Sequence, residues 1–218
     1  MLTLGIETSS ACGSVAVVKD GKTLAKKVFT RTLGHSDRLI PACDAVLRKA
    51  NVKLADLDGV AVGTGPGSYT GLRVGIAAAK GLALLSGIPV VGVPSFDALV
   101  AAHQAKIKSP LFFAVSDAKR GEYYLGAYEK GKQGHIRRKN IELIPVDELK
   151  PKIKKGVTVG GPDWNKMFPT ADAVAALGAE MIRTKKKIAD PEPIYIRPFI
   201  AKKSEEQKWT PFAAAGRK

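Results

Sequence analysis

One stretch, Gly63–Gly75, constrains the fold of this 218-residue chain more than any other. A strand-like run at residues 59–62 leads into a loop with alternating glycines, and the loop opens into a helix-like segment that ends near Ser86. Glycine permits tight turns and a close approach of the backbone to another surface, because it has no Cβ. The pattern therefore predicts a strand–loop–helix unit whose loop packs closely on a neighbour.

The helix that follows this loop is apolar on nearly every side. From Leu72 to Leu85 its only charged side chains are Arg73 and Lys80, which are seven residues apart and share one side. A helix of this kind needs cover on more than one face. The chain's own sheet can cover one face, and we expect a partner molecule to cover the other.

The spacing of small residues predicts where that partner binds. Gly71, Gly75 and Ala79 recur every four residues and form a track that permits close helix approach. The residues left to face the sheet are Ala77, Ala78, Gly81, Leu82 and Leu85. The predicted partner surface, which includes the edge of a helix at 36–50, is Arg38, Leu39, Gly71, Leu72, Arg73, Gly75, Ile76, Ala79, Lys80 and Ala83. The alternative is that both helices are buried under the carboxy-terminal half of the chain.

Length and composition limit the class of protein. A chain of 218 residues, 45% of them hydrophobic, can bury the core of one large domain or of two small lobes. No apolar run reaches membrane-spanning length, since Lys80 interrupts the longest candidate. The first residues lack a secretory signal pattern, and two cysteines are too few for a disulfide framework. We therefore expect a cytoplasmic protein with reduced thiols and no membrane contact.

The formal net charge of +15 is unevenly distributed, because residues 101–218 carry 24 of the 35 lysines and arginines. A positive field of this size favours polyanionic partners and salt-dependent association. Lysine-rich surfaces also serve solubility alone, and no nucleic-acid-binding motif accompanies the charge. Both interpretations of the basic half stay open at this point.

The amino-terminal half alternates between strand and helix patterns in the order βββαβαβα. An Asp20-Gly21 dipeptide predicts a hairpin between the second and third strands, and Ser95 is the expected N-cap of the last helix. The expected strands are 2–8, 13–18, 23–29, 59–63 and 89–93, and the expected helices are 36–50, 70–86 and 95–104.

The carboxy-terminal half resembles a reduced version of the same unit. Its expected strands are 111–116, 122–128, 136–143 and 157–160, with helices at 146–150 and 171–184. Two such units are typical of the α/β actin/hexokinase-type ATPase fold, which has ribonuclease H-like lobes. We expect a first lobe at 1–106, a reduced second lobe at 107–202 and a loose tail at 203–218.

Four stretches, in this order and spacing, resemble the bacterial TsaB (YeaZ) family. They are Gly5-Ile6-Glu7-Thr8-Ser9, the Gly63–Gly75 loop, Asp117–Tyr124 and Pro193-Ile194-Tyr195-Ile196-Arg197. The resemblance covers almost the whole chain. It implies a non-catalytic subunit required with TsaD to form the N6-threonylcarbamoyl group on adenosine next to the anticodon of tRNAs that read codons starting with A.

The resemblance also implies the partners. These are TsaD, which is a catalytic homologue, the ATPase TsaE, and a second copy of the chain bound through the same surface as TsaD. It implies that tRNA is contacted through the complex.

Residue patterns for independent catalysis are missing from the sequence. His35 has Leu39 in place of a second histidine four residues later, so the helical pair that binds metal in TsaD relatives is incomplete, and we expect no metal. Ser68, Cys12 and Cys43 have no local histidine or carboxylate to activate them. We therefore expect no catalytic residues.

Nucleotide binding is expected to be weak or vestigial. Gly63–Gly71 is neither a Walker A loop nor a dinucleotide fingerprint. The ATPase-type fold would place phosphate loops at Glu7, Thr8, Ser9 and Ser10 and at Asp117–Gly121, with an adenine-side turn at Gly160 and Gly161. An alternative to the TsaB-type function is a stand-alone ATP-binding small-molecule kinase or ATPase of this fold, with ATP or ADP as its ligand.

Overall fold

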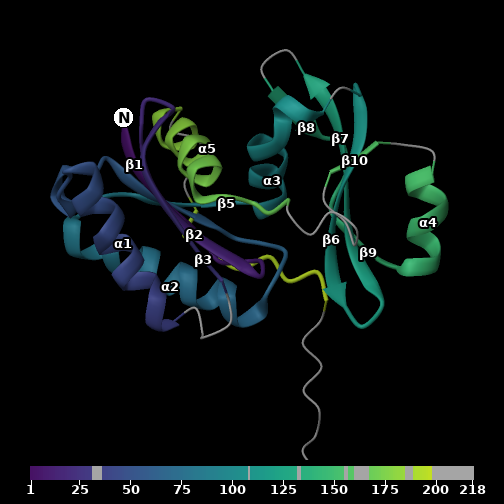
Figure 1. Cartoon of the computed structure of the whole chain (residues 1–218), viewed down its shortest axis with the longest axis horizontal. Coiled ribbons are helices and arrows are strands. Elements are labelled where there is room, and N and C mark those ends of the chain that lie inside the picture. Colours follow the sequence, from purple (N-terminus) through teal and green to yellow (C-terminus); the bar gives the residue numbers. More distant parts are fainter. Residues whose placement is uncertain are drawn as a thin grey trace, which may run out of the picture.

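The computed structural model contains two sheets side by side, each with its own helices (Figure 1). The residues that the structure describes are 1–30, 36–107, 109–131, 134–154, 157–159, 167–184 and 189–197. The predicted tail at 203–218, Gly160 and Gly161 lie outside them.

The first sheet is built entirely from the amino-terminal half. Its strands are β1 (Leu2–Glu7), β2 (Cys12–Lys19), β3 (Lys22–Thr30), β4 (Gly59–Gly63) and β5 (Val90–Val93), in the order β3-β2-β1-β4-β5. The first three strands pair antiparallel, and β4 and β5 run parallel to β1. Its helices are α1 (Ser36–Ala50), α2 (Tyr69–Ser86) and α3 (Ser95–His103).

This element order confirms the predicted βββαβαβα unit and the α/β actin/hexokinase-type fold with a ribonuclease H-like lobe. The predicted hairpin is also present, with Asp20 and Gly21 at φ 48° and 78° between paired Lys19 and Lys22. No helix among the described residues is long and apolar enough to cross a membrane.

Side-chain size differs between the two faces of the first sheet. Bulky residues such as Leu4, Ile6 and Val60 point toward α1 and α2 and form the largest core cluster. The opposite face carries Gly5 and the small side chain of Ala61, because adjacent strand residues point to opposite sides. The small face allows a helix to pack at short range.

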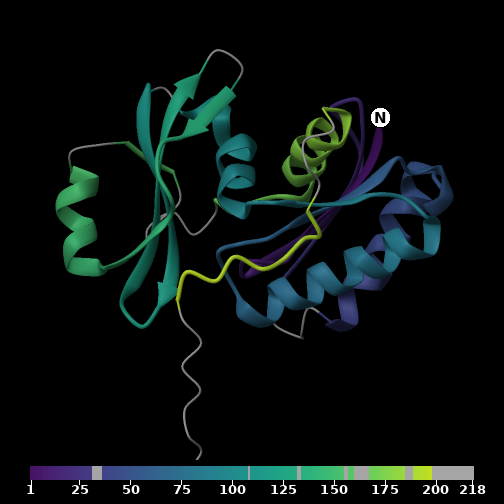
Figure 2. The same cartoon turned by 180° about the vertical axis from the view of Figure 1, so that it is seen from behind.

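The helix on that small face comes from the far end of the sequence. It is α5 (Ala171–Arg183), which packs on β1, β2 and β4. A Cβ on Gly5 would lie 1.9 Å from the Ala171 carbonyl oxygen, and one on Gly178 would lie 2.3 Å from the Ala61 Cβ. Figure 2 shows α5 and the pair α1–α2 on opposite sides of the sheet.

The position of α5 corrects its assignment to the second lobe. The predicted second lobe, residues 107–202, includes α5, which follows the second sheet in the chain. Its small residues instead match the small face of the first sheet. The boundary at 106 and 107 stays a prediction, but a cut there would separate α5 from the sheet that it covers.

The second sheet has the order β10-β6-β7-β8, and β9 also pairs with β7. One helix, α4 (Val146–Lys154), lies between β9 and β10. The strands are β6 (Leu111–Lys119), β7 (Glu122–Gly131), β8 (Gly134–Arg137), β9 (Glu142–Pro145) and β10 (Val157–Val159).

The single strand predicted at 136–143 is wrong. Two short strands occur there, because β8 pairs with the end of β7 at residues 128–131 and β9 pairs with its beginning at 122–125. The intervening chain leaves the ladder between these two pairings. The alternation of the sequence could not show this break, since both halves retain strand-like residues.

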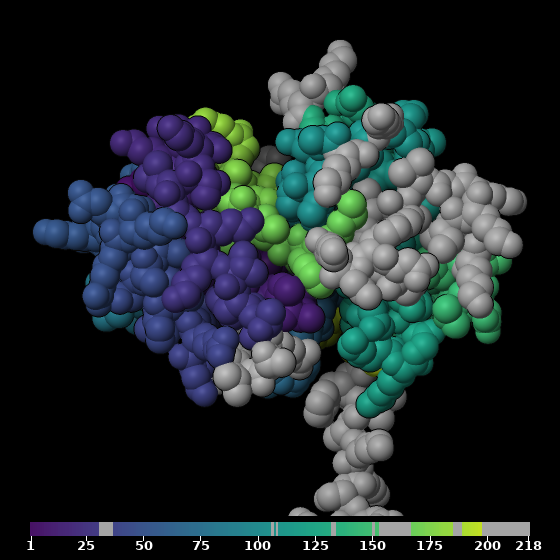
Figure 3. Space-filling model, in the orientation of Figure 1, coloured from purple at the N-terminus to yellow at the C-terminus, as the bar shows by residue number. Residues whose placement is uncertain are grey.

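The two lobes contact each other through α3. Phe96, Leu99 and Val100 of α3 share a buried cluster with Phe112 and Tyr128 of the second sheet. The segment that leads into α5 is visible between the lobes on the face shown in Figure 3. A contiguous apolar layer therefore joins the second sheet to the first lobe.

Two helical glycines provide a matched test of this packing. The substitution Gly178→Ala should lower the free energy of unfolding by about 1–3 kcal/mol, because the new methyl group overlaps Ala61. Gly81→Ala in α2 meets open space and should raise it by roughly 0.5–1 kcal/mol, since alanine favours a helix. Urea unfolding followed by circular dichroism measures both. Equal effects at the two positions would contradict the close seat of α5.

Candidate functional site: a closed loop junction and an exposed helix face

Glu7, an ionisable residue at the end of β1, is fully buried. Its side chain has no exposed surface. Its Oε1 accepts a hydrogen bond from the Ser9 backbone N–H at 2.6 Å, and its Oε2 accepts one from the Ser95 hydroxyl at 2.9 Å. The Ser95 oxygen in turn accepts the Gly65 N–H at 3.0 Å. Glu7 therefore ties the end of β1 to the glycine loop.

Ser95 has a different role from the predicted one. The N-cap of α3 is Pro94, and Ser95 is the first helical residue. Its hydroxyl group points inward, where it bridges Glu7 and Gly65. Sequence reasoning identified a helix start correctly but could not show that the hydroxyl has a buried carboxylate within reach.

The glycine loop packs directly on the turn that follows β1. The Ser68 N–H donates to the Ser9 carbonyl at 2.7 Å, and the Thr8 hydroxyl donates to the Gly71 carbonyl at 2.7 Å. A Cβ on Gly67, Gly71 or Gly75 would lie 2.1–2.3 Å from atoms of Thr8 or Ser9. These glycines are required by this contact, as the close approach predicted from the sequence implies.

The pKa of Glu7 is set by two opposing effects, burial and hydrogen bonding. Removal from water raises the pKa of its carboxyl group above the ordinary value of 4.5, while the hydrogen bonds from Ser9 and Ser95 act in the opposite direction. The pKa is raised on balance.

Residues 7–10 make contacts within the chain, and nucleotide binding by them stays a prediction. The oxygens of Glu7 and the surface of residues 8–9 are already occupied by the chain's own backbone and by Ser95. The Ser10 hydroxyl donates to the Cys12 carbonyl at 2.9 Å. The glycine loop therefore fills the space beside the predicted first phosphate loop.

The predicted second phosphate loop forms a separate hairpin turn. Asp117 accepts bonds from the backbone and side-chain nitrogens of Lys119, both at 2.7 Å, and Gly121 adopts a positive φ of 77°. Within the described ranges, no hydrogen bond or ion pair joins Asp117 or Gly121 to residues 7–10. Direct polar contacts therefore do not link the two predicted loops in the described part of the chain.

The orientation of α2 corrects most of the predicted partner surface. Seven of the ten predicted residues are buried in the chain's own interior. The small-residue track faces the turn at Thr8 and the first sheet, so it is unavailable to a partner. The buried residues are Leu39, Gly71, Leu72, Gly75, Ile76, Ala79 and Ala83.

The remaining three predicted residues lie at or near the surface. Arg73 is exposed, while Arg38 and Lys80 are half-buried. Arg73 donates from Nε to the Tyr195 hydroxyl at 2.9 Å, and Lys80 pairs with Asp190 at 2.5 Å. Both α2 cations therefore bind a distant segment of the same chain.

A different face of α2 is open to solvent. It comprises Thr70, Arg73, Ala77, Gly81, Leu84 and Leu85, and we call it the exposed face of α2. Leu84 and Leu85 retain 84% and 81% of their surface in solvent. Three of its members, Ala77, Gly81 and Leu85, were predicted to face the sheet. These two leucines place apolar surface in solvent at the end of α2.

The described thiol and metal-ligand side chains do not form a reactive cluster. Burial raises the pKa of the Cys43 thiol to about 12, which keeps it protonated and unreactive. No group of three potential metal ligands occurs in the part of the chain that is described. His35 is outside that part, and the expectation of no metal stays a prediction.

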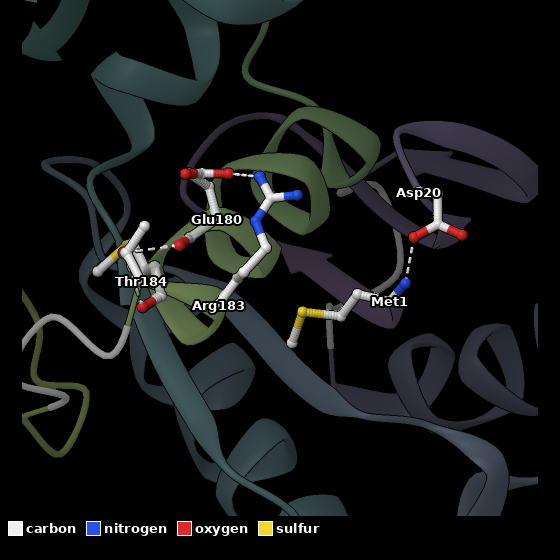
Figure 4. A network of polar contacts seen from close by, with 6 residues as sticks. Met1, Asp20, Glu180, Arg183 and Thr184 are labelled. Atoms are coloured by element: carbon white, nitrogen blue, oxygen red, sulfur yellow. Dashed lines mark hydrogen bonds and ion pairs between the residues drawn. The ribbon is translucent and has the colours of Figure 1, made fainter.

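A hollow of about 230 Å³ lies between Met1, the β2–β3 turn and the second half of α5. Figure 4 shows the polar contacts of residues around it. Its charged groups neutralise each other in pairs, since the Met1 ammonium binds Asp20 and the Arg183 guanidinium binds Glu180. The hollow therefore offers no unpaired charge to a ligand.

Known proteins are similar to this chain in architecture and in sequence. A family model described as TsaD, tRNA N6-adenosine threonylcarbamoyltransferase, matches residues 25–186. The TsaB protein of Escherichia coli, a tRNA threonylcarbamoyladenosine biosynthesis protein by name, is 29% identical across 92% of this chain and 96% of its own length. The chain belongs to the TsaB (YeaZ) family.

Further relatives of this TsaB-family chain agree. An uncharacterized protein of Mycobacterium tuberculosis H37Rv is 38% identical over 89% of this chain and 90% of its own. The crystal structure of YeaZ from Pseudomonas aeruginosa superposes with a TM-score of 0.75 at 21% identity, over 89% of this chain and 99% of that one. The shared fold therefore extends over both lobes.

The buried carboxyl group predicts a pH dependence of stability. Because the folded pKa of Glu7 is raised, its contribution is fully present below about pH 4.5 and is lost as the pH rises through the folded pKa. Glu7→Gln removes this titration, so its stability relative to the original chain should increase from pH 4.5 to pH 7. Chemical unfolding at several pH values measures the difference. A relative stability that falls over this range would show that hydrogen bonds hold the carboxylate charged.

Proposed function

We propose that this chain is a non-catalytic subunit that works with a TsaD-type transferase in forming threonylcarbamoyladenosine on tRNA. The observation that carries the proposal is the exposed face of α2, with two adjacent leucines more than 80% exposed. The names of the TsaB relatives supply the pathway.

The interior of the chain supports a non-catalytic role. The glycine loop packs on Thr8 and Ser9, and both carboxyl oxygens of Glu7 are bonded within the chain. The buried Cys43 thiol is held protonated, and the described residues contain no cluster of metal ligands. We propose that another subunit supplies the chemistry of this pathway.

The exposed face of α2 is the surface that we assign to that subunit. Small residues at Ala77 and Gly81 permit close helix approach, and Leu84 and Leu85 provide apolar area at its end. We propose that a second copy of the chain and the transferase bind this same face and compete for it. TsaE and tRNA then join through the assembled complex, where the positive charge of the chain favours RNA.

The alternative of a stand-alone kinase or ATPase lacks support in the geometry. It requires an open phosphate site and a carboxylate that can reach substrate, whereas Glu7 is fully buried and bonded. Calorimetry of the isolated chain with Mg-ATP should show no tight binding, and a phosphate-release assay no turnover. Stoichiometric binding with turnover by the chain alone would contradict the proposal and restore the kinase.

Two alanine-to-glutamate substitutions test the exposed face of α2 as the partner surface. Ala77→Glu places a carboxylate at the centre of the exposed face of α2, where a partner would bury it, so affinity for the transferase should fall at least about tenfold, which is about 1.4 kcal/mol. Ala176→Glu on α5 is the control, since it makes the same change at an exposed site on the other side of the sheet. Surface plasmon resonance measures the transferase, and analytical ultracentrifugation measures self-association.

The two readouts separate the parts of the proposal. Loss of both associations in Ala77→Glu, with neither lost in Ala176→Glu, supports one shared face. Full retention of transferase binding by Ala77→Glu would place the interface elsewhere and overturn the assignment of α2.

A further inference from the structure

A segment near the end of the described chain connects the two lobes on the side away from α3. Residues 189–197, which we call the strap, run from the first sheet to the tip of the β6–β7 hairpin (Figures 1 and 2). The strap has no regular secondary structure. Its position therefore depends on the contacts that individual residues make.

Backbone and apolar contacts hold the strap to the first lobe. The Ile194 N–H donates to the Thr64 carbonyl at 2.8 Å. Pro191 is buried against Gly92, where an added Cβ would lie 3.2 Å from the proline Cβ. These contacts place the strap beside the end of β4 and β5, next to the start of α2.

Both cations of α2 contribute to the same attachment. Lys80 pairs with Asp190 of the strap, and Arg73 donates to the Tyr195 hydroxyl. The Arg73 guanidinium carbon also lies 4.2 Å from the centre of the Tyr69 ring, and the rings of Tyr69 and Tyr195 are 5.1 Å apart. A guanidinium group over an aromatic face is an attractive contact. The strap therefore binds α2 at two points along its length.

The next two strap residues bind the second lobe. Ile196 packs against the cluster that contains Phe96 and Tyr124, and the Arg197 guanidinium pairs with Glu122 of β7. Glu122 follows the β6–β7 turn directly. Tyr195 and Arg197 thus link α2 to this hairpin through only three consecutive residues.

We propose that the strap couples the α2 surface to the β6–β7 hairpin. Local opening or binding at one of these sites then changes the stability of the other. Arg73 is itself part of the exposed face of α2, so a molecule docked there contacts the residue that holds Tyr195. Coupling of this kind is reciprocal, since each event changes the free energy of the other equally. Only its extension to a docked partner rests on the proposed function.

Hydrogen–deuterium exchange of the isolated full chain tests the coupling. Glu122→Gln weakens the anchor of the strap on the second lobe. Among the described residues, Glu122 forms no hydrogen bond or ion pair with α2. It should accelerate amide exchange in the strap and in residues 69–80 by about fivefold, since this half-buried ion pair contributes about 1 kcal/mol. Glu129→Gln is the matched control, because Glu129 lies on the same strand and pairs with Arg138 instead of the strap. It should leave exchange in residues 69–80 unchanged.

The reverse direction has its own variant. Tyr195→Phe keeps the ring and removes the hydroxyl that binds Arg73, so exchange should accelerate in the hairpin at residues 117–124. Circular dichroism confirms that each variant is folded. Unchanged exchange at residues 69–80 in Glu122→Gln would overturn the proposal, whether or not exchange in the strap itself changes.

Binding of the transferase to Glu122→Gln completes the test. Affinity should decrease although the substitution lies outside the exposed face of α2, and the affinity of Glu129→Gln should be unchanged. If the original chain does not bind the transferase, the proposed function fails, while the exchange data still decide whether the strap couples α2 to the hairpin.

Discussion

The contact between the turn after β1 and the first two turns of α2 determines much of this structure. Thr8 donates to the Gly71 carbonyl, and glycines at 67, 71 and 75 allow the two backbones to approach. A side chain at any of these positions would overlap the turn. The contact sets the rotation of α2 about its axis, and that rotation decides which face of the helix meets solvent.

The same contact covers Thr8 and Ser9, where the sequence predicts the first phosphate loop. Glu7 is enclosed beneath the loop, and its oxygens bond to Ser9 and Ser95. The closed interior and the open face of α2 are thus two results of one packing arrangement. A subunit that contributes a surface instead of a reaction is consistent with this arrangement.

Two segments from the carboxy-terminal half, α5 and the strap, also contribute to the first lobe. The small face of its sheet is complete only when α5 packs on it, through Gly5 and Gly178. The strap then passes from this lobe to Glu122 of the second sheet. Two motif stretches that are far apart in sequence, the glycine loop with Arg73 and the segment with Tyr195, therefore meet in space.

The sequence by itself determined most of the elements, their order in the first lobe and the close approach of the glycine loop, because these depend on local periodicity and on residues without a Cβ. Only the tertiary structure decided which face of α2 is exposed to solvent. A helix that is apolar on nearly every side has too little periodicity to orient it. The tertiary structure also decided which sheet α5 packs on and how Glu7 is buried. Each depends on which residues, distant in sequence, come within van der Waals contact.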